Sequence, residues 1–249
     1  MELAPQGHLR VSLNMANAVL AMSNTMSEKP AGVTIDLSRE LGRRLGVEVE
    51  LIEWAAPGDS VRALATGRAD VGYLAVDPGR AQQVWFTQPY VQIEGCYLAK
   101  AASPLRDHGE VDQPGTDVLV IDTSAYDLHL TRTLKHATIV RLGDARDVLQ
   151  ALLAHDGRAV VAGVKQALIN DMKSTEGLRL LDGYFMAIFQ AMVLPRGRSE
   201  IARQAVEAFL GEMVESGFIA SSLASHGIDG ATVVREASAA ATGVAFRAI

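Results

Sequence analysis

Short apolar runs that are typical of β-strands alternate along this chain with amphipathic stretches that are typical of helices. The run 9–13 is followed by apolar residues at helical intervals over 33–45, and Gly46 ends that stretch. Apolar residues then alternate with glutamates over 47–51, as in a half-exposed strand, and a short helix is expected over 59–66. Strands that alternate with helices imply an α/β architecture with mostly parallel sheets.

A second series of the same kind follows a polar stretch, 101–115, which is rich in proline, glycine and serine. We expect strands at 93–100, 118–121, 138–142 and 159–163 and helices at 124–134 and 144–154. The apolar run 186–194 is expected to return toward the first half, and a long amphipathic helix over 199–216 follows it. The alanine-rich residues from 230 on are expected to be frayed.

Composition limits the possible classes of function. The chain has 249 residues, of which 49% are apolar and 21% charged, so it can form one large domain or two small ones. Its net charge is 23 − 29 = −6 with both signs interspersed, which argues against a nucleic-acid partner, since phosphate binding needs a basic face. No apolar run reaches the ~18 residues that span a bilayer. The histidines are scattered, so no metal site is predicted. The sequence has no phosphate- or dinucleotide-binding glycine motif, so no cofactor is predicted either.

The segment 69–90, ADVGYLAVDPGRAQQVWFTQPY, says most about function. A strand-like run at 71–75 leads into the turn Asp77-Pro78-Gly79, and Arg80 follows this turn directly. An arginine in this position can present its planar guanidinium to a carboxylate, an arrangement that a flexible lysine reproduces less well. The alternative interpretation is a solvated surface arginine.

This segment resembles the family 3 extracellular solute-binding proteins, the amino-acid-binding components of ABC importers, and the resemblance extends over roughly residues 9–227. Asp77 replaces the usual threonine of the family pattern, and the residues that match it are Asp70, Arg80, Phe86, Thr87, Pro89 and Tyr90. The resemblance implies a two-lobed, type II periplasmic-binding-protein fold of the α/β class. The lobes would comprise 1–94 plus 192–249 and 95–191, with a hinge near Glu94 and Gln190 and a ligand in the cleft. The alternative fold is a single doubly wound sheet.

The same resemblance implies a set of ligand-binding residues. In the family the arginine holds the α-carboxylate of the ligand, which makes Arg80 the leading candidate. In the second lobe, hydroxyl and N–H groups at a helix start bind the carboxylate, and the corresponding turn here contains Thr123 and Ser124. Capping of this helix by Asp122 or Thr123 is the alternative. Further ligand-binding candidates are Tyr73, Ala75 and Gln190. Asp70 is expected to be structural and to cap the loop before Arg80.

Two departures from the family pattern bear on the ligand. Val164 or Lys165 occupies the place of the aspartate that pairs with the ligand's ammonium, and a lysine there would repel an ammonium. The aromatic residue that follows the first strand is missing, and Asn14 and Asn17 offer amides instead. We therefore expect an anionic ligand other than an ordinary α-amino acid, such as a dicarboxylate or an aromatic acid. The alternative interpretation of Lys165 is a surface lysine at the start of a helix.

Glu94 lies in the otherwise apolar run 91–98, so its carboxylate must be paired, protonated or directed into the cleft. It could pair with Arg80 or Lys165 in the ligand-free state, or it could donate a proton. Some proteins that resemble this family are dehydratases, including cyclohexadienyl dehydratase. A cleft enzyme acting on a small organic acid is therefore the competing hypothesis, with Glu94 and Lys165 as its catalytic pair. A cytoplasmic ligand-sensing module is the third.

The N-terminal residues MELAPQG carry neither a basic nor an apolar signal region. If a signal peptide was removed, we expect a periplasmic monomer that delivers its ligand to an ABC permease; if Met1 is the native start, we expect a cytoplasmic protein. The single cysteine, Cys96, excludes an internal disulfide and is expected to be an inert core residue.

Overall fold

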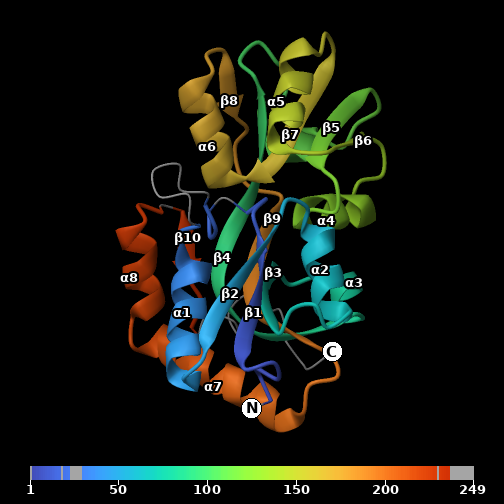
Figure 1. Ribbon diagram of the computed structural model, residues 1–249. Helices are drawn as coiled ribbons and strands as arrows, with labels where there is room; N and C mark the ends of the chain where they lie inside the picture. The colour runs from blue at the N-terminus through green and yellow to red at the C-terminus, as the bar shows by residue number, and fades with distance from the viewer. Residues whose placement is uncertain (1, 18, 23–29, 229, 236–249) are drawn as a thin grey trace. The chain divides into compact units, whose positions relative to one another are not determined.

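The chain divides into two compact units. The computed structural model (Figure 1) describes residues 2–17, 19–22, 30–228 and 230–235. Unit 1 comprises Met1–Gln92 and Phe189–Ile249, and unit 2 comprises Ile93–Ile188. This division contradicts the alternative of a single doubly wound domain. The expected boundaries lie within three residues of this division, but Glu94 belongs to unit 2 and Gln190 to unit 1, the reverse of the expected assignment.

The physical reason for that shift is that both crossings lie inside long strands. Strand β4 extends over Val84–Lys100 and strand β9 over Met186–Pro195, so no turn or change of composition marks the boundary. The strand expected at 93–100 is shorter than β4, which already includes Phe86–Tyr90.

Unit 1 contains a sheet with the strand order β2-β1-β3-β9-β4, and β10 pairs with β4. β1 is parallel to β2 and β3, and β9 is antiparallel to β3. The bounds of the remaining strands are His8–Asn14 (β1), Glu48–Trp54 (β2), Val71–Ala75 (β3) and Ala231–Val233 (β10). β10 was not expected, because residues from 230 on were predicted to be frayed; residues 236–249 lie outside the described part of the chain.

The helices of unit 1 are α1 (Val33–Leu45), α2 (Pro57–Ala65), α3 (Pro78–Ala81), α7 (Glu200–Glu215) and α8 (Phe218–Ser225). α1 ends as predicted, because Gly46 adopts the left-handed conformation (φ 67°) that favours glycine. Leu9, Val11 and Leu13 of β1 are fully buried, so the first strand lies in the core. The apolar spacing of the sequence did not predict α8.

The strands of unit 2 follow the order β4-β7-β5-β6, and β8 pairs with β4. β5 is parallel to β6 and β7, whereas β7 is antiparallel to β4. The bounds of these strands are Thr116–Ile121 (β5), Thr138–Leu142 (β6), Arg158–Val164 (β7) and Leu178–Leu180 (β8). The helices are η1 (His108–Glu110), α4 (Ala125–Thr133), α5 (Ala145–Ala154) and α6 (Lys165–Ser174). Apolar residues of β4, β5, β7 and the flanking helices form its core, including Leu98, Leu119, Leu152, Val161 and Leu168.

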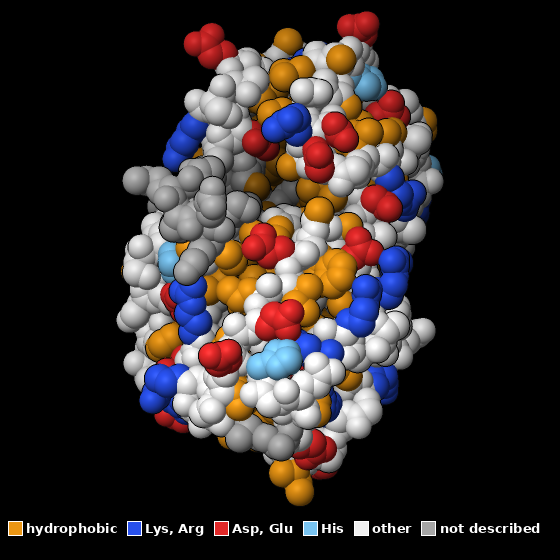
Figure 2. Space-filling view, in the orientation of Figure 1, with side chains coloured by type: hydrophobic (Ala, Val, Ile, Leu, Met, Phe, Trp, Pro, Cys, Tyr) orange, Lys and Arg blue, Asp and Glu red, His pale blue; other side chains and the backbone are white. Residues whose placement is uncertain are grey.

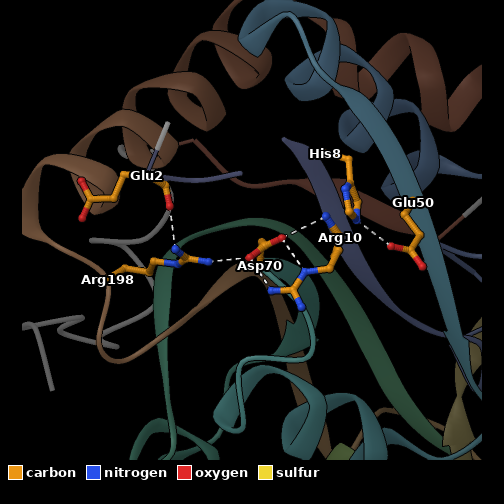
Figure 3. A network of polar contacts seen from close by, with 6 residues as sticks. All are labelled: Glu2, His8, Arg10, Glu50, Asp70 and Arg198. Atoms are coloured by element: carbon orange, nitrogen blue, oxygen red, sulfur yellow. Dashed lines mark hydrogen bonds and ion pairs between the residues drawn. The ribbon is translucent and has the colours of Figure 1, made fainter. Parts of the chain in front are cut away.

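A buried carboxylate joins three distant segments of unit 1 (Figure 3). Asp70 is fully buried and accepts hydrogen bonds from the Arg10 backbone N–H (3.1 Å), from Arg10 Nη2 (2.9 Å) and from Arg198 Nη2 (2.5 Å). Arg198 also donates to the Glu2 carbonyl, which ties the start of the chain to the segment before α7. Asp70 is therefore structural, but it does not cap the loop before Arg80 as predicted.

An ion-pair network at the surface of unit 1 gives a prediction about pH. Glu40 accepts hydrogen bonds from Arg43 (2.8 Å) and Arg44 (2.7 Å), which lower the pKa of its carboxyl to about 2. Arg44 also contacts Glu212 and so joins α1 to α7. Because the folded-state pKa lies below that of the unfolded chain, this stabilisation is complete above about pH 5 and is lost as the pH falls toward 2.

We expect Glu40→Gln to lower the free energy of unfolding of unit 1 by up to about 1 kcal/mol at pH 7. The difference from wild type should shrink steadily below about pH 4.5. Urea unfolding at several pH values, followed by tryptophan fluorescence, measures it, because Trp54 and Trp85, the two tryptophans of the chain, both lie in unit 1. A difference that stays constant from pH 7 to pH 3 would contradict the expectation.

Candidate functional site

Arg80 lies on a single helical turn directly after the buried strand β3. The turn expected at 77–79 is the start of α3, and Asp77 is its N-cap. Asp77 Oδ1 accepts the backbone N–H groups of Gly79 (2.9 Å) and Arg80 (3.1 Å), and Pro78 occupies the first helical position. Asp77, which stands where the family pattern has threonine, thus caps the turn and sets the direction of Arg80.

The side chain of Arg80 is held against the end of β3. Arg80 is only 5% exposed, and its Nη1 donates a hydrogen bond to the Ala75 carbonyl at 3.1 Å. This burial excludes the alternative of a solvated surface arginine. A buried guanidinium needs acceptors or a counter-charge, since an uncompensated buried cation is costly. Burial and the hydrogen bond to Ala75 therefore hold the guanidinium of Arg80 in a defined orientation.

Four more predicted residues meet in unit 1. A small cavity of about 10 Å³ is lined by Asn14, Asn17, Leu20, Ala21, Thr34, Tyr73 and Gln190. Gln190 is also the register partner of Ala75 across β9 and β3, so the cavity adjoins the strand end that holds Arg80. The structure thus brings together the predicted residues Asn14, Asn17, Tyr73 and Gln190 and places Ala75 beside them.

Polar atoms of these residues are buried. Asn17 Oδ1 is buried and accepts no hydrogen bond from the residues that the structure describes. The hydroxyl of Tyr73 accepts a hydrogen bond from Ser38 Oγ (3.1 Å), and burial raises its pKa, so Tyr73 is neutral. Thr34 was missed by sequence reasoning, because the apolar period of helix 33–45 carries no information about a hydroxyl in its first turn. Its Oγ1 donates to the Leu20 carbonyl at 3.0 Å.

In unit 2, the start of α4 is occupied by a carboxylate of the protein itself. Ser124, rather than Asp122 or Thr123, is the N-cap, and its Oγ accepts the Asp127 N–H at 3.1 Å. Asp127 Oδ2 in turn accepts the Thr123 N–H at 3.0 Å, and Arg141 pairs with the same buried carboxylate. The alternative of plain helix capping therefore holds here, through a different residue than expected.

Thr123 adopts a left-handed backbone conformation, with φ 57°. This region is strained for a β-branched residue and unstrained for glycine. We expect Thr123→Gly to stabilise unit 2 by about 1 kcal/mol. Hydrogen exchange of core amides in β5 and β7 measures this effect. The matched control is Thr138→Gly on the exposed strand β6, which should destabilise unit 2; a loss of protection in both variants would contradict the expected strain.

Lys165 and Glu94 form an ion pair in unit 2. The distance between Lys165 Nζ and Glu94 Oε2 is 2.5 Å, and this hydrogen bond raises the pKa of Lys165. Of the two predicted partners of Glu94, Lys165 is the one that the structure pairs with it. Val164, the other candidate for the family's aspartate position, is the N-cap residue of α6. Cys96 nearby is buried, which raises the pKa of its thiol to about 11, as expected of a core cysteine.

Three further features of the described residues bear on function. On the face seen in Figure 2, acidic and basic side chains are interspersed. Within the described part of the chain, His, Cys, Asp and Glu side chains form no group that could hold a metal ion. Among the same residues, no helix combines the length and the apolar character needed to cross a membrane.

Comparisons with solved structures show the fold. An amino acid ABC transporter substrate-binding protein of Streptococcus pneumoniae, AbpA, bound to L-arginine, is 17% identical, with a TM-score of 0.76 over 90% of this chain and 95% of that one. The ancestral amino-acid-binding protein AncCDT-1, a precursor of cyclohexadienyl dehydratase, is 19% identical, with a TM-score of 0.76 over 92% of this chain and 98% of that one. The predicted type II periplasmic-binding-protein fold is confirmed.

Comparisons of sequence show the family. A curated protein, the membrane-bound lytic murein transglycosylase F of Idiomarina loihiensis, is 24% identical over 208 residues. That match covers 78% of this chain but 44% of the transglycosylase, so the chain spans less than half the length of this relative. The model of the bacterial extracellular solute-binding proteins, family 3, matches residues 9–226, close to the extent of the resemblance seen in the sequence. This chain therefore belongs to the bacterial extracellular solute-binding proteins, family 3.

Proposed function

We propose that this protein binds a small ligand through a carboxylate that Arg80 holds. The observation that carries the proposal is the position of Arg80, which is buried and fixed against the carbonyl of Ala75. The register partner of Ala75 is Gln190, which lines a cavity together with Asn14 and Asn17. A guanidinium held in this way has lost rotamer freedom before the ligand arrives, and its fork suits a carboxylate. AbpA, with the same fold, is bound to an amino acid, which supports a ligand with a carboxylate.

The ligand that we propose is an anion rather than an ordinary zwitterionic α-amino acid. Of Val164 and Lys165, the two residues that can occupy the family's ammonium-binding aspartate position, we take Lys165 as the one that faces the ligand, and a cation there repels a second cation. In this proposal the protein acts outside the cytoplasmic membrane and delivers its ligand to an ABC permease.

Calorimetric titration with a panel of organic acids and amino acids tests this function. Organic acids are expected to bind more tightly than zwitterionic amino acids of the same size. Mass spectrometry of any small molecule that stays bound through purification would identify the ligand directly. Nanomolar binding of a zwitterionic amino acid would contradict the anionic ligand.

A dehydratase is the second candidate, and the Glu94–Lys165 pair is the observation that favours it. The 2.5 Å contact places a carboxyl group and an ammonium where they could exchange a proton with a bound acid. AncCDT-1, which has the same fold, is itself an amino-acid-binding protein and a precursor of cyclohexadienyl dehydratase. Incubation with arogenate and prephenate, followed by mass spectrometry, tests it: conversion that Glu94→Gln abolishes would support the enzyme, and unchanged substrate would reject it.

A further inference from the structure

A cavity of about 470 Å³ lies within unit 2. Residues from the end of β4, the loop after it, the end of α5 and the start of β7 line it, among them Lys100, Asp156 and Arg158. Lys100 is the last residue of β4 and lies six residues, roughly 20 Å, along that strand from Glu94. Arg158 is the first residue of β7, whereas Lys165 follows the end of that strand. The cavity is therefore separate from the Glu94–Lys165 pair.

Arg158 brings N–H groups to this cavity that lack an acceptor among the described residues. A guanidinium carries five N–H donors, and the acceptor that Arg158 has is Gln113 Oε1, at 3.4 Å from Nη2. Arg158 Nε is buried and has no partner in the described part of the chain. Thr116, the register partner of Arg158 on β5, also has a buried hydroxyl without a partner there. Buried donors normally have an acceptor, so a bound molecule with acceptor oxygens would satisfy the guanidinium.

A second cation in the lining is held in a defined position. Lys100 Nζ donates hydrogen bonds to the carbonyls of Leu153 (2.7 Å) and His155 (2.7 Å) at the end of α5, and an ammonium has a third N–H for another acceptor. The ring of His155 is engaged on both sides. Its Nδ1 accepts the Gly157 N–H at 2.9 Å, so Nε2 carries the hydrogen and donates it to Asp117 at 3.0 Å. His155 therefore forms a neutral wall of the cavity.

The lining combines a positive charge with an apolar wall. Lys100 and Arg158 against Asp156 give it a formal charge of +1. Leu152 and Ala159 line the same cavity and are buried, with exposed fractions of 1% and 4%. Sites of this volume hold small molecules whose body contacts apolar side chains while a few polar groups fix the orientation. The lining therefore suits an anion that also has an apolar part.

We infer that this cavity is a second binding site, for a small organic anion whose carboxylate or phosphate group contacts Arg158 and Lys100. The oxygens of such a group accept N–H groups and donate none, which matches the donors that both side chains present. The apolar part of the anion lies against Leu152. The site lies entirely in unit 2 and does not depend on the proposed role of Arg80.

Amide NMR spectra of the isotope-labelled full chain, titrated at constant ionic strength, test this site. The probes are benzoate, phenyl phosphate and the neutral benzamide. We expect saturable shifts of the Ser103 and Gly157 amides with at least one anion, and at least about tenfold weaker binding of benzamide. The anion that binds more tightly identifies the preferred group. Shifts at Ala75 and Arg80 report the site proposed in unit 1 separately.

Variants of charged residues in unit 2 make the test specific. Arg158→Met should weaken anion binding on the order of tenfold, and Arg158→Lys, which keeps the charge but not the planar fork, should fall between it and wild type. Asp156→Asn removes an acidic side chain of the lining and should tighten binding about two- to fivefold. Arg146→Met, at an exposed arginine of α5, is the matched control and should bind as wild type does.

Three results would overturn the inference. The first is a lack of response of the unit 2 amides to both anions. The second is wild-type affinity in Arg158→Met, provided that its spectrum shows a folded protein. The third is benzamide binding as tight as that of the anions, which would show an apolar pocket without selectivity for charge.

Discussion

Replacing Asp70 with alanine is expected to lower the free energy of unfolding of unit 1 by about 3–5 kcal/mol. Asp70 is fully buried, and its two arginine partners, Arg10 and Arg198, have side chains that are only 13% and 15% exposed. Without the carboxylate, two largely buried guanidinium groups lose the anion that they share, and the Arg10 backbone N–H loses its acceptor (Figure 3).

Tryptophan fluorescence during urea unfolding measures this effect, since both tryptophans report on unit 1. Asp59→Ala is the matched control, because Asp59 also pairs with an arginine, Arg62, but the two side chains are 40% and 67% exposed. It should cost less than about 1 kcal/mol. Equal losses in Asp70→Ala and Asp59→Ala would show that burial of the Asp70 network does not govern its contribution. Asp70→Asn, which keeps the shape and removes the charge, should fall between wild type and alanine.

Replacing Arg80 with alanine is expected to weaken carboxylate binding by about 2–5 kcal/mol, which corresponds to a loss of roughly thirtyfold or more in affinity. The reason is that the carboxylate of the bound ligand would then lie desolvated without its cationic partner. Arg80→Lys keeps the charge but not the two-pronged hydrogen bonding, so it should recover only part of the affinity.

Calorimetric titration with the tightest-binding acid of the wild-type panel measures this loss. Arg62→Ala, which removes an exposed arginine of α2, should leave affinity unchanged. Because Arg80 also donates to the Ala75 carbonyl, the unfolding of each variant must be compared with wild type first. Wild-type affinity in a folded Arg80→Ala protein would remove Arg80 from the site.

Much of the fold could be predicted because it depends on short-range patterns. The apolar period of 33–45 and the glycine after it define α1, and alternation of side chains defines β2. The segment 69–90 placed Arg80 directly after a buried strand, and the structure shows it there, with its guanidinium on the Ala75 carbonyl only five residues away. The position of a residue just after a turn depends on the backbone conformation of the turn, and the turn residues next to it in the sequence determine that conformation.

The roles of particular polar side chains could not be predicted in the same way, because their partners are distant in sequence. Asp70 was assigned to the loop before Arg80, yet its partners lie 60 residues before it and 128 residues after it. Likewise, the turn of Thr123 was expected to bind the carboxylate of a ligand. In the structure the N–H of Thr123 donates its hydrogen bond to the carboxylate of Asp127, in the first turn of α4. The hydrogen-bond partner of a buried polar group depends on how distant segments pack together. The spacing of apolar residues along the sequence contains no information about this packing.

The sequence by itself determined the α/β class, the family and the place of Arg80, since each is contained in local patterns or in a motif of adjacent residues. Only the tertiary structure decided which charges compensate one another. Strand pairing brings residue 94 beside residue 165, and the packing of β1, β3 and the segment before α7 gathers two arginines around Asp70. Burial makes these choices energetically decisive, because a charge removed from water must find a partner wherever the fold provides one.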